Sequence, residues 1–127
     1  MRKHINSGII WENIVGYSRA TRVNNFIEVS GTTAMDGNQL VGENDVYAQS
    51  VFIFKKIEKS LNDLGGNMVD VVRTRMFVTD ITQWEAIGRA HGEFFSTIKP
   101  VTTMIEVQRL IKPEFLIEIE VTAIVGA

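Results

Sequence analysis

An amphipathic segment over residues 44–64 constrains the fold of this chain more than any other stretch of its sequence. Apolar side chains recur there at spacings of three and four residues, the periodicity of a helix with one buried face. These side chains are Tyr47, Val51, Phe54, Ile57, Leu61 and Leu64. Asn44 or Asp45 suits the N-cap, and Gly65 suits the left-handed residue that often follows a helix. Such a helix needs a second layer against which to bury its apolar face.

Strands and one further helix supply that layer. Alternation of apolar and polar side chains predicts three strands after the helix, over residues 71–79, 101–110 and 116–125. Residues 83–97 predict a second amphipathic helix, and residues 17–31 predict a hairpin that turns at Asn24-Asn25. This order of elements predicts an α+β fold with both helices packed on one face of the sheet.

The opposite face of the predicted sheet is too polar for a core and too aromatic for a face that meets only water. We expect it to carry Arg73, Arg75, Phe77, Thr102, Met104, Glu106, Gln108, Glu118 and Glu120. Such a face is either the wet side of an antiparallel sheet or a surface that lines a cleft between subunits. Phe52 and Ile53 lie off the apolar stripe of the first helix, which makes them candidates for contact with a partner chain.

Length and charge narrow the classes of protein that this chain can represent. A chain of 127 residues supports one hydrophobic core, so we expect a single domain over residues 1–127. Its net charge of −2 provides no general field that attracts nucleic acid, and no nucleic-acid partner is expected. The absence of cysteine excludes disulfides and thiolate chemistry, and two histidines cannot build a three-histidine metal site.

No stretch of the sequence has the pattern of a targeting or membrane segment. The apolar run near the start, Ile9-Ile10-Trp11, is too short for the core of a signal peptide. No window approaches the roughly 18 apolar residues that a membrane-spanning helix needs. We therefore expect a cytoplasmic protein without a membrane partner.

Glu118 and Glu120 are the first candidates for catalytic residues. Two residues apart on a strand, their carboxylates point to the same side, roughly 7 Å apart. One of them is suited to act as a general base on water; the alternative is that both form ion pairs across strands.

His91, on the apolar stripe of the second helix, is interpreted as a hydrogen-bonded core residue. The Ser30-Gly31 turn offers backbone N–H groups to an anion or a carbonyl oxygen, although such turns are common.

Six stretches of the chain match one protein family in their order and spacing. They are GYSRATRVNNFIEVSGTTA (residues 16–34), AQSVFIFKKIEKSLNDLGG (48–66), DVVRTRMFVTDI (70–81), HGEFF (91–95), KPVTTMIEVQRL (99–110) and LIEIEVTA (116–123). No single stretch is specific, but the ordered set covers nearly the whole chain. Together they resemble the reactive intermediate deaminase family, also called Rid, YjgF or L-PSP.

This resemblance implies a fold and an activity. The family fold is a mixed sheet with two helices packed on one face, like the small bacterial chorismate mutase. Members form homotrimers, and their ligand sites lie in clefts between subunits. Members that are enzymes hydrolyse enamines and imines, such as 2-aminoacrylate, to a 2-keto acid and ammonia, and they need no metal or cofactor. The resemblance therefore implies a small-molecule ligand of the 2-keto or 2-imino acid type.

Matching motifs imply which residues form the pocket. Tyr17 comes from the GY stretch, Ser30 and Gly31 from VSG, and Glu118 is the first acid of LIEIE. In this interpretation Ser30 and Gly31 hold the substrate, and Glu118 orients or activates the attacking water.

One position departs from the deaminating branch of the family. That branch carries an arginine two residues after the proline of this motif, where its guanidinium clamps the substrate carboxylate. Here Pro100 and Val101 are followed by Thr102, which has no charge. Either the site takes a less acidic ligand, so that activity on 2-imino acids is weak, or Arg19 or Arg75 replaces the clamp.

Three functions therefore remain open at the level of sequence. The first is an enamine or imine hydrolase that uses Glu118. The second is a non-catalytic trimer that binds a metabolite in the same clefts, which the uncharged Thr102 favours. The third, less favoured because of the acidic net charge, is an endoribonuclease or translation inhibitor.

Overall fold

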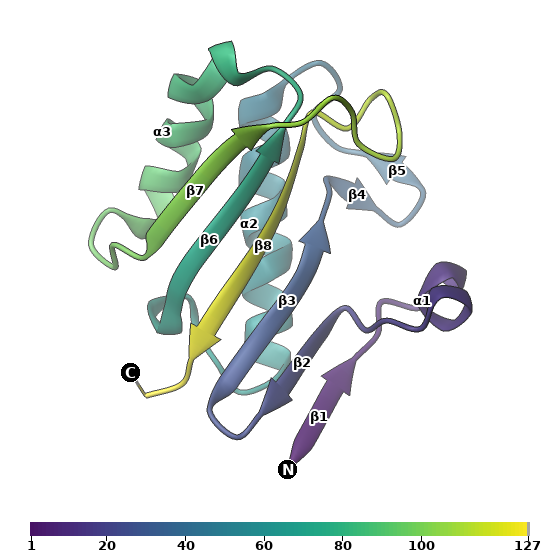
Figure 1. Cartoon of the computed structure of the whole chain (residues 1–127), viewed down its shortest axis with the longest axis vertical. Helices are drawn as coiled ribbons and strands as arrows, with labels where there is room; N and C mark the ends of the chain where they lie inside the picture. Colours follow the sequence, from purple (N-terminus) through teal and green to yellow (C-terminus); the bar gives the residue numbers. More distant parts are fainter. Residues whose placement is uncertain (127) are drawn as a thin grey trace.

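The computed structural model describes residues 1–126 and consists of one large sheet with two long helices on one face (Figure 1). Six strands form this sheet in the spatial order β1-β2-β3-β8-β6-β7. Their bounds are Arg2–Ile5 (β1), Ala20–Val23 (β2), Phe26–Thr32 (β3), Val71–Val78 (β6), Val101–Glu106 (β7) and Ile117–Ile124 (β8). The helices are α1 (Ile10–Val15), α2 (Val46–Asp63) and α3 (Trp84–Phe95). Short 3-10 turns span Met68–Asp70 and Ile81–Gln83, and a small hairpin pairs β4 (Met35–Asp36) with β5 (Gln39–Leu40).

The two long helices share a face because both connect parallel strands. Strands β6 and β7 pair in parallel, and α3 links them. Strands β3 and β6 both run antiparallel to β8, which lies between them, and α2 makes the crossover from β3 to β6. Crossovers between parallel strands are almost always right-handed, so both helices lie on the same side of the sheet. The predicted α+β fold with a mixed sheet is confirmed.

Helix α2 begins and ends as its sequence predicts. The Asp45 side chain caps the first turn by accepting a hydrogen bond from the Ala48 backbone N–H at 3.0 Å. Gly65 follows the helix with a φ of 82°, a conformation that glycine adopts without strain. The Arg22 guanidinium donates to the Leu64 carbonyl at 2.7 Å and so satisfies one of the free acceptors at the helix end.

The buried face of α2 is wider than the predicted stripe. Ile53 is completely buried in the core of its own chain, and Phe52 packs against that core, so the predicted partner contact by Ile53 is wrong. Tyr47 and Val51 are only half-buried. The physical reason is that α2 packs against both the sheet and α3, which turns a second side of the helix inward.

Two elements near the N-terminus have no counterpart in the sequence predictions. Strand β1 pairs antiparallel with β2 and extends the sheet by one strand. Helix α1 follows it and lies beside the β1–β2 side of the sheet, away from α2 and α3 (Figure 1). Four residues of charged strand and six of helix are too short to show a periodicity. None of the helices within residues 1–126 is long and apolar enough to cross a membrane.

The face of the sheet away from the helices, called the open face below, differs from its prediction along β7. Thr74 and Met76 of β6 are buried on the helix side, and their register partners on β7 are Thr102 and Met104. In a parallel pair, register partners point to the same side of the sheet, so Thr102, Met104 and likewise Glu106 belong to the helix side.

The remaining members of the open face follow from the same register. Gln108 lies beyond the end of β7 and outside the sheet. The open face instead receives Val101, Thr103 and Ile105, the partners of Arg73, Arg75 and Phe77. On the neighbouring strand, Glu118 and Glu120 take the predicted side, because Ile117 and Ile119 are buried under the helices.

A buried glutamine joins the start of α2 to the segment before β8. Gln49 is completely buried; its amide nitrogen donates to the carbonyls of Gly42 and Glu114, each at 3.1 Å. Its amide oxygen accepts from the Leu116 N–H at 3.0 Å. Every polar atom of this side chain therefore has a partner, and three backbone groups depend on it.

We predict that Gln49→Leu lowers the free energy of unfolding by about 2–3 kcal/mol, because buried backbone groups lose their partners. Chemical denaturation measures the change, and Gln39→Leu, at an exposed position on β5, serves as the control with little effect. An unchanged denaturation midpoint in Gln49→Leu would show that water replaces these hydrogen bonds at no cost.

Candidate functional site

A β-bulge in β3 creates the centre of the candidate site. The register of β3 against β8 shifts between the pairs Val29↔Val121 and Thr32↔Ile119. Between these pairs β3 has one residue more than β8, so Ser30-Gly31 forms the bulge. Bulges bend a strand locally and turn its side chains to new directions, and they are frequent beside active sites.

The carboxylate of Glu118 occupies the space that the bulge leaves at Gly31. A methyl group built on Gly31 would lie 3.0 Å from the carboxylate carbon of Glu118 and would overlap one of its oxygens. A side chain at position 31 would therefore force the Glu118 carboxylate to move, so Gly31 leaves the space that this carboxylate occupies. The contact holds Glu118, which is half-buried, over the backbone of β3.

Burial governs the ionisation of Glu118. It raises the pKa of the Glu118 carboxyl, and the negative charge of Glu120 raises it further, while the positive charge of Arg19 lowers it. A carboxyl group with a raised pKa exchanges protons closer to neutral pH than an exposed one, as a general acid or base requires. Of the candidate residues, Glu118 thus has the environment that suits proton transfer.

Arg19 is the cation whose charge lowers the pKa of Glu118. Its guanidinium donates to the Gly31 carbonyl at 2.7 Å, and its Nε is buried without a hydrogen-bond partner within residues 1–126. Burial lowers the pKa of Arg19, and this is opposed by Tyr17, Glu12 and Glu118. The Tyr17 side chain is 37% exposed, so it is accessible to a ligand. The structure therefore brings Tyr17, Arg19, Gly31 and Glu118 together.

Both hydrogen-bond donors of Ser30 are already paired with backbone carbonyls of the same chain. Its hydroxyl donates to the Ser18 carbonyl at 2.7 Å, and its backbone N–H donates to the Arg19 carbonyl at 3.0 Å. Ser30 therefore fixes the bulge to the segment that carries Tyr17 and Arg19, and it offers a ligand only the lone pairs of its hydroxyl.

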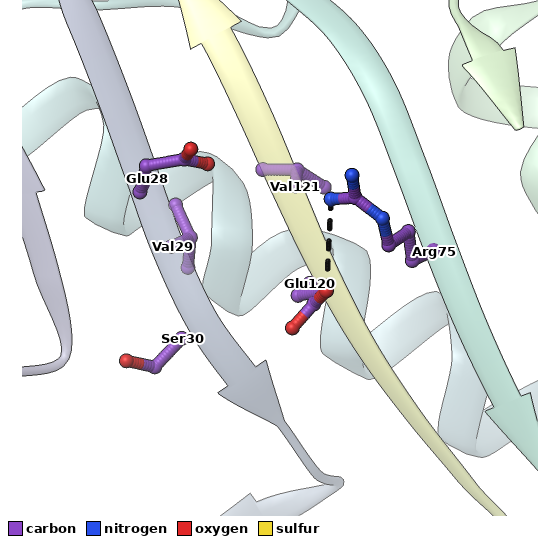
Figure 2. Close-up of a pocket in the computed structure, with 6 residues that line it drawn as sticks. All are labelled: Glu28, Val29, Ser30, Arg75, Glu120 and Val121. Carbon is purple, nitrogen blue, oxygen red and sulfur yellow. Dashed lines mark ion pairs between the residues drawn. The ribbon is translucent and has the colours of Figure 1, made fainter.

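Arg75 lies in a separate part of the open face. A hollow of about 280 Å³ is lined by Glu28, Val29, Ser30, Arg75, Glu120 and Val121 (Figure 2). Within it, the Arg75 guanidinium and the Glu120 carboxylate form an ion pair at 3.6 Å, drawn as a dashed line in Figure 2. The hollow adjoins the bulge through Ser30 but contains neither Glu118 nor Arg19. Arg75 is therefore paired with Glu120 rather than placed beside Glu118.

Thr102 does not share this site within one chain. It lies on the helix side of β7, whereas Glu118 lies on the open face of β8, with β6 between the two strands. The Thr102 hydroxyl accepts a hydrogen bond from Thr74 at 2.6 Å, and the Thr74 hydroxyl lies 2.9 Å from Nε2 of His91. The prediction that His91 is hydrogen-bonded agrees with this contact, but His91 is only partly buried rather than a core residue.

Three polar residues near these groups were missed by the sequence analysis. Glu12 is buried in α1 and accepts hydrogen bonds from the backbone and hydroxyl of Ser7. Lys56 of α2 donates to the carbonyls of Met35 and Thr33, at 2.8 Å and 3.3 Å. Thr74 is fully buried at the centre of β6. None of these contacts is local in sequence apart from that of Glu12, so a periodicity search has no signal for them.

No group of three or more His, Cys, Asp or Glu side chains is arranged to hold a metal ion within residues 1–126. The two acids near the bulge interact with cations. The charge of Arg19 acts on Glu118, and Glu120 forms an ion pair with Arg75.

Comparison with known proteins assigns this chain and its fold to one family. The family model described as "Endoribonuclease L-PSP" matches residues 11–125. The crystal structure of Rv2704 from Mycobacterium tuberculosis, a member of the YjgF/YER057c/UK114 family, superposes with a TM-score of 0.90. It is 42% identical, and the match covers 98% of this chain and 100% of that one.

Two curated relatives also match this chain over most of its length. An uncharacterised protein of Streptomyces coelicolor is 36% identical over 98% of this chain and 93% of its own length. The 3-aminoacrylate deaminase RutC of Acinetobacter baylyi is 33% identical over 81% of this chain and 82% of its own length. The chain therefore belongs to the Rid/YjgF/L-PSP family, as the ordered motifs predicted.

We predict that Glu118→Gln stabilises the protein at pH values above the ordinary carboxyl pKa of 4.5. Folding raises the pKa of Glu118, so ionisation costs more in the folded chain than in the unfolded chain, and this cost grows as the pH rises. The melting temperature of Glu118→Gln should exceed that of the wild type at about pH 8, and the difference should vanish at about pH 4.

The matched control is Glu120→Gln, which removes an ion pair with Arg75 and should give no increase in melting temperature. A Glu118→Gln variant that is less stable than the wild type at both pH values would contradict the assignment. It would mean that the Glu118 carboxylate is a net structural contact.

Proposed function

We propose that residues 1–127 form one subunit of a homotrimer that hydrolyses small imines or enamines in clefts between subunits, with Glu118 as the acid–base residue. The observation that carries this proposal is the placement of Glu118, half-buried over Gly31 with a raised pKa and beside Arg19. The similarity to the 3-aminoacrylate deaminase of Acinetobacter baylyi supports the same class of reaction.

The proposed reaction needs one water and proton transfers only. The oxygen of water bonds to the imine carbon while the electron pair of the C=N bond moves to nitrogen, which takes up a proton. Glu118 accepts the proton that the water loses and returns it to nitrogen. The resulting amino alcohol then collapses to a carbonyl group and releases ammonia. No electron acceptor enters this balance, because carbon is not oxidised.

An enamine requires one additional step before hydrolysis. A proton must be added to its β-carbon to form the imine, and a carboxyl group with a raised pKa is suited to deliver it. Glu118 would then act first as acid and afterwards as base. A single group with its pKa shifted towards neutrality serves both steps.

The neighbouring residues have distinct proposed roles. Tyr17 lines the exposed side of the site, and Ser30 and Gly31 provide the bulge against which the substrate rests. Arg19 moderates the pKa of Glu118 and is held in place by the Gly31 carbonyl.

The exposed apolar side chains of the open face support the proposed trimer. Val23 and Phe26 at one side, and Val101 and Ile105 at the other, are each between 43% and 56% exposed. Large apolar residues gathered on a sheet face commonly mark a protein interface. Facing sheets of neighbouring subunits would bury these residues and enclose Glu118.

A non-catalytic, metabolite-binding trimer is the second candidate function. The specific observation in its favour is Thr102, which leaves the position of the clamping arginine without charge. The ribonuclease activity in the family's description is a weaker candidate for this chain, because its net charge is −2.

If the protein is a hydrolase, Glu118→Gln should lower its rate about 10²- to 10⁴-fold, the usual cost of losing a general base. Ammonia release from freshly generated imines measures the rate. Glu120→Gln should cost less, because Glu120 is paired with Arg75. Equal rates in wild type and Glu118→Gln would instead favour the binding protein.

Gly31→Ala tests the placement of Glu118 without removing it. The added methyl group would displace the carboxylate, so the rate should fall although both chemical groups remain. Gly88→Ala is the matched control: its methyl group meets open space on α3, and activity should be unchanged. Full activity in Gly31→Ala would show that the position of Glu118 over the bulge is not needed.

The proposed assembly predicts a mass of roughly three times the 14.3 kDa of one chain. Light scattering at micromolar concentration, a direct measure of mass in solution, checks this. A stable monomer would contradict both the trimer and the site between subunits.

A further inference from the structure

Two cations lie directly opposite each other on the edge strands β1 and β2. Lys3 of β1 and Arg22 of β2 are register partners, and Arg22 is also the partner of Ile27, which is buried under the helices. Register partners point to the same side of a sheet, so both cations lie on the helix side, near the turn between β2 and β3 (Figure 1). Like charges directly opposite each other destabilise a sheet. Such a pair becomes favourable when a negative charge is shared between the two cations.

The two cations have no carboxylate partner within residues 1–126. Asp63, the acid at the end of α2, is paired with Lys59 at 2.8 Å. A lysine on an edge strand discourages pairing with another chain, but that role does not require a second cation opposite it. The negative charge that would balance Lys3 and Arg22 must therefore come from outside the described chain.

A hollow of about 290 Å³ opens beside the two cations. Its lining consists of Met1, Lys3, Arg22, Asn24 and Leu64, and both charged side chains in this lining are cationic. The volume is several times the roughly 30 Å³ that one water molecule occupies in the liquid, so the hollow admits a small anion.

Arg22 is held in position before any ligand binds. Its Nε donates to the Asn24 carbonyl at 2.8 Å, and one terminal nitrogen donates to the Leu64 carbonyl at 2.7 Å. A methyl group built on Gly65 would lie 2.8 Å from that terminal nitrogen, so Gly65 leaves space for the guanidinium. A guanidinium has five N–H donors, and three remain after these two bonds. Two of the three, on adjacent nitrogens, form the planar fork that holds two oxygens of one anion.

The end of α2 opposes an anion, and Arg22 offsets this effect. Carbonyl groups at the end of a helix carry partial negative charge, and the Arg22 guanidinium lies against one of them. Lys3 is exposed and adds a second positive charge directly opposite Arg22. The hollow therefore combines a fixed fork on one strand with a mobile point charge on the next.

We propose that Lys3 and Arg22 form an anion site for a phosphate group, either as inorganic phosphate or as the phosphate of a small monoester. A phosphate group carries between about 1.5 and 2 negative charges at neutral pH and at least three acceptor oxygens, which matches two cations. A carboxylate has one charge and two oxygens and matches the pair less well. Glu118 lies on the opposite face of the sheet, so this site does not depend on the proposed hydrolase function.

Titration of the full-length protein with inorganic phosphate and with phenyl phosphate tests the proposal. Amide NMR signals of Lys3, Arg22 and Gly65 should shift most, at constant ionic strength. The dissociation constant should be on the order of 1 mM, the affinity expected of two exposed charge-assisted hydrogen bonds. Tighter binding of phenyl phosphate identifies a monoester as the ligand, and equal binding identifies inorganic phosphate; either result supports the site.

Lys3→Gln should weaken phosphate binding about tenfold, the value of one hydrogen bond between charged groups. Lys3 is exposed, so the substitution leaves the core intact, and its removal relieves the repulsion with Arg22. Without phosphate and at low ionic strength, the melting temperature of Lys3→Gln should therefore be no lower than that of the wild type. Lys55→Gln, at an exposed position on α2, removes the same charge elsewhere and is the matched control, with binding like the wild type.

Two results would overturn the proposal. One is the absence of shifts at Lys3, Arg22 and Gly65 at about 10 mM phosphate, or equal affinities in wild type and Lys3→Gln. The other is a set of shifts centred on Gly31, which would show that phosphate binds at the candidate site on the other face of the sheet.

Discussion

The close approach of the Glu118 carboxylate to Gly31 is the constraint on which the candidate site depends. It depends on the bulge in β3, on the absence of a side chain at Gly31, and on the position of Glu118 on β8, two residues from Glu120, which lies opposite the bulge. Ser30 secures the bulge by two hydrogen bonds to the preceding segment, and Arg19 secures it from the other side. These hydrogen bonds connect the bulge to the preceding segment, and a preformed site lowers the free-energy cost of orienting a ligand.

Electrostatics divide the open face into two parts. Near the bulge, Glu118 is buried enough that its pKa rises, and Arg19 limits that rise. In the adjoining hollow, Arg75 and Glu120 neutralise each other across β6 and β8. The two acids of the same strand, which are equivalent in the sequence pattern, therefore have different environments: burial raises the pKa of Glu118, whereas Glu120 forms an ion pair with Arg75.

Local sequence patterns predicted the helices and strands better than they predicted the tertiary contacts between them. The hairpin, α2 and α3 follow from sequence periodicity and turn residues, and α2 also from its Asp45 cap, because these features depend on neighbours in sequence. The inward position of Ile53 and the orientation of Thr102 do not, because one depends on how α2 meets α3 and the other on the register of an edge strand. The contact of Thr74 with His91 joins a strand to a helix, and no local rule contains it. Glu118 was found from a motif, whereas its pKa depends on burial in the folded chain.

The central proposal is that one ligand site is completed by two subunits. The family motifs suggest that Glu118 and Thr102 belong to one site, but the two residues lie on opposite sides of the sheet in one chain. A crystal structure of the assembled protein tests this most directly. The account predicts a cleft in which the carboxylate of Glu118 faces the Thr102 hydroxyl of the neighbouring subunit. An assembly in which Thr102 of every subunit lies away from all Glu118 carboxylates would contradict it.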